Sequence, residues 1–297
     1  MRVVFLGNHT VGVRALRAIG ESAEVAAVVA HPPDPEDGSR YESVSDFADA
    51  NSWNLIRGNG KSPEVHRFIK EAQPDLLWIT DFRYLISREL IALARLGAVN
   101  LHPSLLPAYR GRASINWAIL KGERRLGLTA HFVDEGMDTG DIIDQVSYEV
   151  CDAQDVGDCL NILYPLYDDI TRKVLAYFKS DRVPRVPQDH SSATSFPRRR
   201  PEDGLIDWAQ TARSILNLVR AVASPYPGAF TTFSGKKATV WKARIASDTD
   251  STAAPGRVIE NHELGPVVQC GQGTLLLTSF ETSPLNAVLG AGCQLGV

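Results

Sequence analysis

The chain is organised around the stretch Asn100-Leu101-His102-Pro103-Ser104-Leu105-Leu106-Pro107, which is followed downstream by Glu135-Gly136-Met137-Asp138-Thr139-Gly140-Asp141. Residues 97–101 read as a short buried strand, and His102-Pro103 ends it because proline cannot donate to a sheet ladder. Asn100 lies two residues before His102, so alternation puts both side chains on the same side of the strand. In an open α/β sheet, ligands bind at the carboxyl ends of the strands.

Asp138 follows the next predicted strand, residues 128–133, in its exit loop. A loop after a neighbouring strand can bring this carboxylate against the imidazole of His102. Ser104 lacks the G-x-S-x-G setting of an activated serine, so the pattern favours acyl transfer without a protein nucleophile. A neutral imidazole can take a proton from an amine, an amide NH₂ can donate to an oxyanion, and a carboxylate can orient the imidazole. Taken singly, the simpler interpretations are a capping Asn, a core His and an N-cap Asp; the combination favours a site.

The string NLHPSLLPAYRGR, with INWAI and MDTGDI downstream, resembles the 10-formyltetrahydrofolate-dependent formyltransferase family. That family includes enzymes that formylate methionyl-tRNA, glycinamide ribonucleotide and amino-sugar nucleotides. The resemblance runs from Met1 to about Val258 and is nearest to the sugar-nucleotide enzymes, such as the UDP-4-amino-4-deoxy-L-arabinose formyltransferase. It implies that Asn100, His102 and Asp138 are catalytic, that 10-formyltetrahydrofolate is the co-substrate, and that no metal is needed.

The resemblance also implies two sets of binding residues. One set would wall the pteridine pocket of the folate, partly through main-chain groups: Phe82, Arg83, Tyr84, Leu85, Ile86, Val133, Glu135 and Gly136. The other set would contact the acceptor substrate: Ser104, Arg110, Arg112, Asn116 and Trp117. Without the resemblance, the first segment reads as a core turn with a solvated Arg, and the two later arginines as surface cations.

Composition bounds the class of protein. The chain has 297 residues, 44% of them hydrophobic and 22% charged, with a net charge of −4. This is typical of a globular chain with one large or two ordinary domains, without the basic footprint of a nucleic-acid binder. The four cysteines form no CxxC pair, which favours neither a zinc site nor a disulfide framework. We expect no signal peptide, no membrane span and a cytoplasmic location.

The apolar pattern predicts an α/β domain over residues 1–182, with a Rossmann-like, mostly parallel sheet. The expected strands are 2–6, 25–30, 55–56, 76–80, 97–101, 128–133 and 142–148. The first expected helix follows the turn that ends at Gly12, and the others span residues 44–51, 63–72, 114–121 and 155–178. Pro165 should kink the last helix or split it in two. The first turn, Gly7-Asn8-His9-Thr10-Val11-Gly12, is not G-x-G-x-x-G and gives little support for a dinucleotide.

Residues 183–204 are rich in proline, serine and arginine and read as a linker. Its cluster Arg198-Arg199-Arg200 could bind a nucleotide diphosphate or pair with Glu202 and Asp203, and the second interpretation is favoured. Residues 205–297 predict a small OB-like β-barrel domain. This domain should hold a helix at 211–221 and strands at 229–233, 237–244, 256–259, 267–270 and 274–280. Such a topology does not itself imply RNA.

The acceptor expected from the resemblance is a UDP- or dTDP-linked amino sugar. The motives are the Arg110-Gly111-Arg112 and Ile115-Asn116-Trp117 matches, and an acidic loop at 31–38 where the tRNA enzymes carry a basic insertion. The alternatives are methionyl-tRNA, a hydroxyornithine-type amino acid, and a non-catalytic folate or sugar-nucleotide binding module. The expected partners are folate and a sugar nucleotide, with no membrane and with nucleic acid only in the tRNA case. A homodimer stays open, as do the sugar and its use in lipopolysaccharide or an antibiotic.

Overall fold

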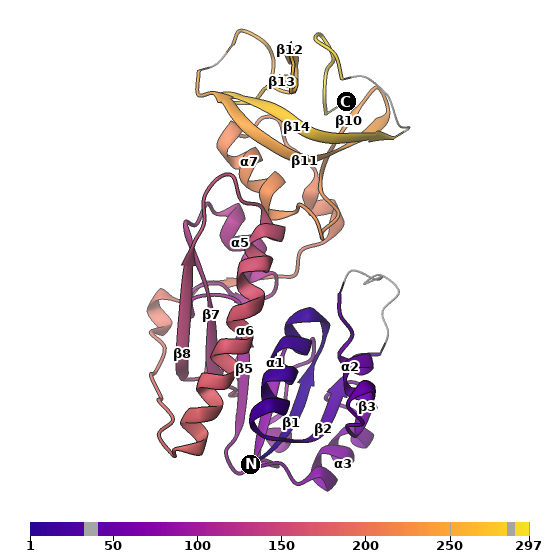
Figure 1. The fold of residues 1–297 in the computed structure, drawn as a ribbon. Helices are drawn as coiled ribbons and strands as arrows, with labels where there is room; N and C mark the ends of the chain where they lie inside the picture. The colour runs from indigo at the N-terminus through magenta and orange to yellow at the C-terminus, as the bar shows by residue number, and fades with distance from the viewer. Residues whose placement is uncertain (33–40, 250, 284–288, 297) are drawn as a thin grey trace. The chain divides into compact units, whose positions relative to one another are not determined.

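The chain folds into two compact units in a computed structural model that describes residues 1–32, 41–249, 251–283 and 289–296 (Figure 1). Unit 1 comprises Met1–Ser114, Arg125–Tyr148 and Leu160–Phe196, and unit 2 comprises Ile115–Arg124, Glu149–Cys159 and Pro197–Val297. The last crossing, between Phe196 and Pro197, falls inside the predicted linker; the domain boundaries 1–182 and 205–297 stay predictions. The acidic loop predicted at 31–38 lies mostly outside the described residues.

Unit 1 is built on a seven-stranded sheet with the order β3-β2-β1-β4-β5-β7-β8. The strands are β1 (Arg2–Gly7), β2 (Glu24–Ala30), β3 (Leu55–Arg57), β4 (Leu76–Thr80), β5 (Ala98–His102), β7 (Arg125–Phe132) and β8 (Ile142–Glu149). The first five pair in parallel, whereas β7 pairs antiparallel with β5. The predicted mostly parallel α/β sheet is confirmed, and each predicted strand appears within a few residues of its expected bounds.

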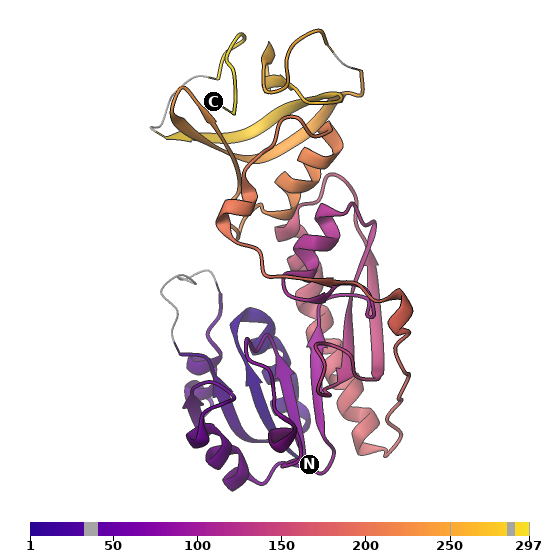
Figure 2. The same cartoon turned by 180° about the vertical axis from the view of Figure 1, so that it is seen from behind.

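Helices pack on both faces of this sheet because its central strands, such as β1 and β4, are apolar and buried along nearly their whole length. They are α1 (His9–Ser22), α2 (Val44–Ala50), α3 (Pro63–Ala72), α4 (Arg88–Ile91) and α6 (Val156–Lys179). In Figure 1, α1 and α6 lie in front of the sheet, and Figure 2 shows the opposite face. On that second face, Val65 and Ile69 of α3 join Val4 and Leu6 of β1 in one buried cluster.

Pro165 lies inside α6, which runs unbroken for 24 residues. Of the two outcomes predicted for this proline, a split is therefore wrong, and a kink stays a prediction. Proline removes one helical hydrogen bond, here to the carbonyl of Asn161. Asn161 is exposed, so water can satisfy that carbonyl, while the buried stripe that includes Leu163 and Val174 keeps the helix packed.

Part of the predicted linker belongs to unit 1. Ser195–Phe196 forms β9, which pairs in parallel with β6 (Arg110–Gly111) in a separate two-stranded sheet. The amide of Arg110 donates to the Thr194 carbonyl at 2.8 Å, and the amide of Arg112 donates to the Phe196 carbonyl at 3.1 Å. The predicted linker is therefore hydrogen-bonded to the loop that follows β5.

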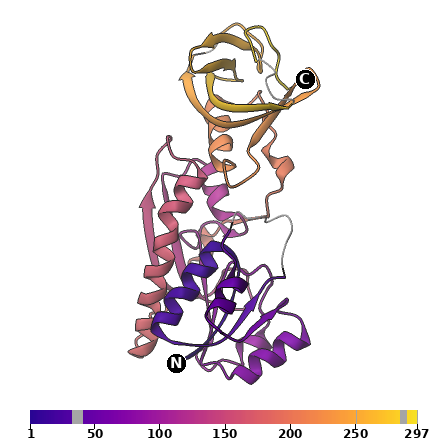
Figure 3. The same ribbon diagram turned by 45° about the vertical axis from the view of Figure 1, so that its right-hand side comes forward.

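Unit 2 contains an antiparallel five-stranded sheet with the order β10-β11-β14-β13-β12. Its strands are β10 (Ala229–Phe233), β11 (Lys236–Ser247), β12 (Val258–His262), β13 (Gly265–Gln269) and β14 (Thr274–Ser283). Its helices include α5 (Ser114–Leu120) and α7 (Ala212–Ala221), and α7 packs on β11 and β14. The small antiparallel β domain is confirmed, and Figure 3 shows its long strands curling. Among the described residues, no pairing joins the edge strands β10 and β12.

No helix within the described ranges is long and apolar enough to cross a membrane.

Candidate active site

Asn100, His102 and Asp138 meet in unit 1. Asn100 and His102 point to the same side of β5, and Asp138 comes from the loop between β7 and β8. The Asp138 Oδ1 atom lies 3.4 Å from Asn100 Nδ2, and its Oδ2 atom lies 3.5 Å from His102 Nδ1. The structure thus brings together an amide, an imidazole and a carboxylate that are separated by up to 38 residues in sequence.

The hydrogen-bond partners of His102 fix which ring nitrogen is basic. Its Nε2 atom lies 2.8 Å from the carbonyl oxygen of Tyr109, which can only accept, so Nε2 carries the hydrogen. In the neutral ring the lone pair is then on Nδ1, which faces Asp138 Oδ2. A proton that reaches Nδ1 completes an ion pair with this carboxylate.

Burial sets the charges of this pair. His102 is 5% exposed, and burial lowers the pKa of His102 below its ordinary value, against the raising effect of Asp138 and Tyr109. Burial also acts to raise the pKa of Asp138, but His102, His131 and the Gly111 amide together hold that pKa well below its usual range. At neutral pH the site therefore holds a neutral imidazole beside a carboxylate.

His131 fixes the orientation of the Asn100 amide from the neighbouring strand. The two residues are directly opposite in the antiparallel β5–β7 register, with Asn100 Nδ2 at 3.1 Å from His131 Nε2. His131 Nδ1 lies 2.7 Å from the Phe132 carbonyl and must donate to it, so Nε2 is an acceptor while the ring is neutral and a donor when the ring is protonated. With the neutral ring, Asn100 Nδ2 donates to His131, and its second hydrogen points toward Asp138.

Asp138 is held by groups around the β6 loop and the linker. Its backbone has φ 56°, in the left-handed region, and its Oδ2 atom accepts from the Gly111 amide at 2.9 Å. Gln188, 6% exposed, donates from Nε2 to the carbonyls of Asp138 at 2.8 Å and Gly140 at 2.7 Å. Its Oε1 atom accepts from Arg110 Nη2 at 2.6 Å.

The residues predicted to bind folate belong to two segments of unit 1, one that follows β4 and one that follows β7. Phe82, Arg83, Tyr84 and Ile86 are half-buried and Leu85 is 62% exposed, whereas Val133 is half-buried and Glu135 and Gly136 are exposed. Glu135 makes an ion pair of 3.5 Å with Arg88, which lies two residues after the first segment. Val133 also lines a cavity of about 300 Å³, with Ala98 and Gly140. That these two segments bind folate stays a prediction.

The residues predicted to contact the acceptor are divided between the units. In unit 1, Ser104 and Arg110 are buried; Ser104 donates to the Ala108 carbonyl at 2.7 Å, and Arg110 is bonded to Gln188. Arg112 is exposed and donates from Nη2 to the Arg83 carbonyl at 2.7 Å. In unit 2, Asn116 is buried with Nδ2 on the Ala221 carbonyl at 2.7 Å, and Trp117 is half-buried.

Sequence reasoning missed His131 and Gln188. His131 lies in a strand that was predicted, and its only signal is its register opposite Asn100, which a strand pattern does not give. Gln188 lies in a segment with linker composition. Across the part of the chain that the structure describes, no group of three or more His, Cys, Asp or Glu side chains is arranged to hold a metal ion.

The sequence matches known family models over most of its length. Residues 1–163 match the family model described as formyl transferase, and residues 199–287 match the formyl transferase C-terminal domain. The chain is 34% identical over 286 residues to a methionyl-tRNA formyltransferase of Acetivibrio thermocellus, covering 95% of this chain and 92% of that protein.

Two solved structures share the fold at lower identity. A sugar 3N-formyl transferase named WlaRD, crystallised with dTDP and 5-N-formyl-tetrahydrofolate, aligns with TM-score 0.70, 19% identity and coverage of 93% of this chain and 96% of that one. An N-formyltransferase from Helicobacter canadensis, complexed with folinic acid and dTDP-3-aminofucose, aligns with TM-score 0.68, 18% identity and coverage of 93% and 98%. On the matched domains and on the relative from Acetivibrio, the chain belongs to the formyl transferase family.

Proposed function

We propose that this enzyme transfers the formyl group of 10-formyltetrahydrofolate to the primary amine of a substrate. The observation that carries the proposal is the meeting of Asn100, His102 and Asp138, with a buried neutral imidazole facing a carboxylate at 3.5 Å. Such a base can take a proton from an amine near neutral pH.

The reaction needs no covalent enzyme intermediate. The amine nitrogen forms a bond to the formyl carbon, and the formyl oxygen becomes an oxyanion. This oxyanion accepts the second Asn100 Nδ2 hydrogen, which in the free enzyme makes only the long 3.4 Å contact with Asp138. The amine proton goes to His102 Nδ1, where Asp138 stabilises the imidazolium. The bond from the formyl carbon to N10 of the folate then breaks, N10 keeps the electron pair, and His102 returns a proton to it. The products are a formamide and tetrahydrofolate.

The acceptor in this proposal is an amino sugar linked to UDP or dTDP. It is supported by the resemblance of Arg110-Gly111-Arg112 and Ile115-Asn116-Trp117 to the sugar enzymes, and by the net charge of −4, which opposes a phosphate backbone. Initiator methionyl-tRNA is the second candidate, favoured by the 34% identity to a methionyl-tRNA formyltransferase across 95% of the chain.

The test is formyl transfer by the purified chain, followed as tetrahydrofolate release and as product mass. UDP- and dTDP-amino sugars, methionyl-tRNA and hydroxyornithine are offered separately, with His102→Ala as the matched inactive control. The sugar proposal expects turnover with one of the sugar nucleotides. Turnover with only the tRNA or only the amino acid would replace it. Folate binding without turnover on any amine would leave a binding module.

A further inference from the structure

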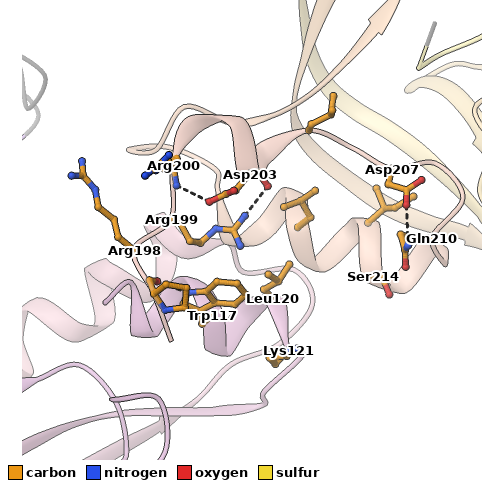
Figure 4. A pocket seen from close by; sticks show the side chains of 14 residues that line it. Trp117, Leu120, Lys121, Arg198, Arg199, Arg200, Asp203, Asp207, Gln210 and Ser214 are labelled. Carbon is orange, nitrogen blue, oxygen red and sulfur yellow. Dashed lines mark hydrogen bonds between the residues drawn. The ribbon is translucent and has the colours of Figure 1, made fainter. Parts of the chain in front are cut away.

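Unit 2 contains a cavity of about 780 Å³ that lies wholly among its own residues (Figure 4). Side chains from α5, from the segment 197–203 and from α7 line it. A cavity of this size is typical of small-molecule sites. It contains none of the residues Asn100, His102 and Asp138, which belong to unit 1.

The lining carries an excess of positive charge. It includes Lys121 and the cluster Arg198-Arg199-Arg200 against two carboxylates, Asp203 and Asp207. Of the two predicted partners of the arginines, Asp203 is bound to Arg199 and Arg200 through main-chain groups, but no ion pair between these four cations and a carboxylate is found within the described residues. The carboxylate of Asp203 instead accepts from the backbone amide of Arg200 at 2.7 Å.

Arg199 is held ready for an anion. Its guanidinium lies 4.9 Å from the ring centre of Trp117, and its Nη2 atom donates to the Asp203 carbonyl at 2.7 Å (Figure 4). Its Nε atom is buried and has no acceptor among the described residues. Burial also lowers the pKa of Arg199 below its ordinary value, against the opposing charge of Asp203. An unsatisfied, fixed guanidinium is a strong donor for an anion because little rotamer freedom remains to be lost.

The floor beside these cations is apolar. Leu205 is 53% exposed, and Leu120, Ile215 and Leu218 complete the wall with the half-buried Trp117. A ligand that fits both parts of the cavity has a group with several negative charges, which binds the cations, and a flat, partly apolar group, which packs on the apolar side chains. Phosphates suit forked guanidinium donors, and nucleoside bases suit an apolar and aromatic wall.

We propose that this cavity binds a nucleoside phosphate, with its phosphate on Arg198, Arg199 and Arg200 and its base against Leu205 and Trp117. The cavity contains none of the proposed catalytic residues Asn100, His102 and Asp138, although Trp117 is also among the residues predicted to contact the acceptor. The proposal therefore rests on the cavity and its cations and does not depend on catalysis. The nucleoside phosphate can come from a free or sugar-linked nucleotide or from an RNA chain, which share this chemistry.

The test is calorimetric titration of the full chain, without folate, with UDP, dTDP, pyrophosphate and a short single-stranded RNA. The variants are Arg198→Gln and Arg199→Gln, and Arg244→Gln on β11 is the matched control because Arg244 is exposed outside the cavity. Far-UV circular dichroism verifies folding, and Lys121→Gln, at an exposed residue, replaces Arg199→Gln if that variant is unfolded.

We expect a nucleotide or the RNA to bind, and each variant of a lining cation to weaken it by about tenfold, as loss of a charge-assisted hydrogen bond does. Arg244→Gln should bind as the parent does. The ligand with the lower dissociation constant, UDP, dTDP or the RNA, then identifies the source of the nucleoside phosphate. Absence of binding by all nucleoside phosphates would overturn the proposal, as would binding that the lining variants leave unchanged or that Arg244→Gln weakens equally. Because no amine or formyl donor is present, this outcome is independent of the formyl-transfer assay.

Discussion

Gln188 Nε2 donates to the main-chain carbonyl of Asp138 at 2.8 Å, so a residue from the predicted linker holds the backbone of the proposed catalytic carboxylate. The same amide donates to Gly140 and accepts from Arg110, and each of its polar atoms is therefore used. Because Asp138 has a left-handed φ of 56°, its loop needs such fixed partners to present the carboxylate to His102.

Gln188→Leu should lower kcat for formyl transfer because the carboxylate is displaced. The KM for the folate should change little, because none of the residues predicted to bind folate is hydrogen-bonded to Gln188. It leaves the part-buried carbonyl of Asp138, the buried carbonyl of Gly140 and Arg110 without this partner, and we expect a loss of about 1–3 kcal/mol in the free energy of unfolding. The control is Gln269→Leu in unit 2, which removes a buried amide that also donates to two carbonyls. A purely structural role for Gln188 would give the same stability loss in both variants with an unchanged kcat and pH profile.

The pH dependence of kcat/KM should report His102. The base acts when neutral, so the rate rises as pH increases through the pKa of His102 and then levels off. Because burial lowers this pKa, the rising limb should lie below the ordinary histidine value of about 6.5. Asp138→Asn removes the charge that raises the pKa of His102, so the limb should move further toward acid. The plateau should fall by about 10-fold to 10³-fold. A limb above the ordinary value, or an unmoved limb in Asp138→Asn, would remove His102 as the base.

The sequence was sufficient for elements that carry a local signal. Leu76–Thr80 is a continuous apolar run and forms β4 at those bounds. Pro63 begins α3 and Ala72 ends it, as predicted from the position of the proline. Asn100, His102 and Asp138 were brought together because two of them share a strand face and the third follows a neighbouring strand.

The remaining features depend on long-range pairing that has no periodic signal. The two-residue strand β9 is too short for a pattern, yet it pairs with β6, 85 residues earlier in the chain. The apolar residues of β7 do not indicate whether the strand runs parallel or antiparallel to β5. The antiparallel register is what places His131 opposite Asn100. Gln188 could not be told from linker because two of its partners are main-chain carbonyls, which every residue type supplies, and the third, Arg110, lies 78 residues earlier in the chain.

His131 should act on the reaction only through Asn100. His131→Phe removes the acceptor of Asn100 Nδ2, so the amide can rotate away from the oxyanion position, and kcat should fall by about tenfold. The measurement is a double-mutant cycle with Asn100→Ala, read in kcat. Coupling requires that His131→Phe has little further effect when Asn100 is already absent. Additive losses would show that His131 acts independently, for example by supporting the core.

Gly111→Ala tests whether the β6–β9 pairing positions Asp138. Gly111 has φ 95°, and a Cβ there would collide with the main-chain oxygen of Phe196. The strand must then move away from β9, which takes the Gly111 amide from Asp138 Oδ2. Gly235→Ala is the matched control, with φ 71° and no atom within 4 Å of the added Cβ, so it carries the backbone strain of about 1 kcal/mol without the collision.

Thermal unfolding and kcat, measured on both variants, separate the effect of backbone strain from the effect of the lost hydrogen bond. We expect both variants to lose stability but only Gly111→Ala to lose activity and to shift the pH limb of His102 toward acid, because Asp138 moves away from the ring. Equal activity in the two variants would mean that the amide of Gly111 contributes only to folding.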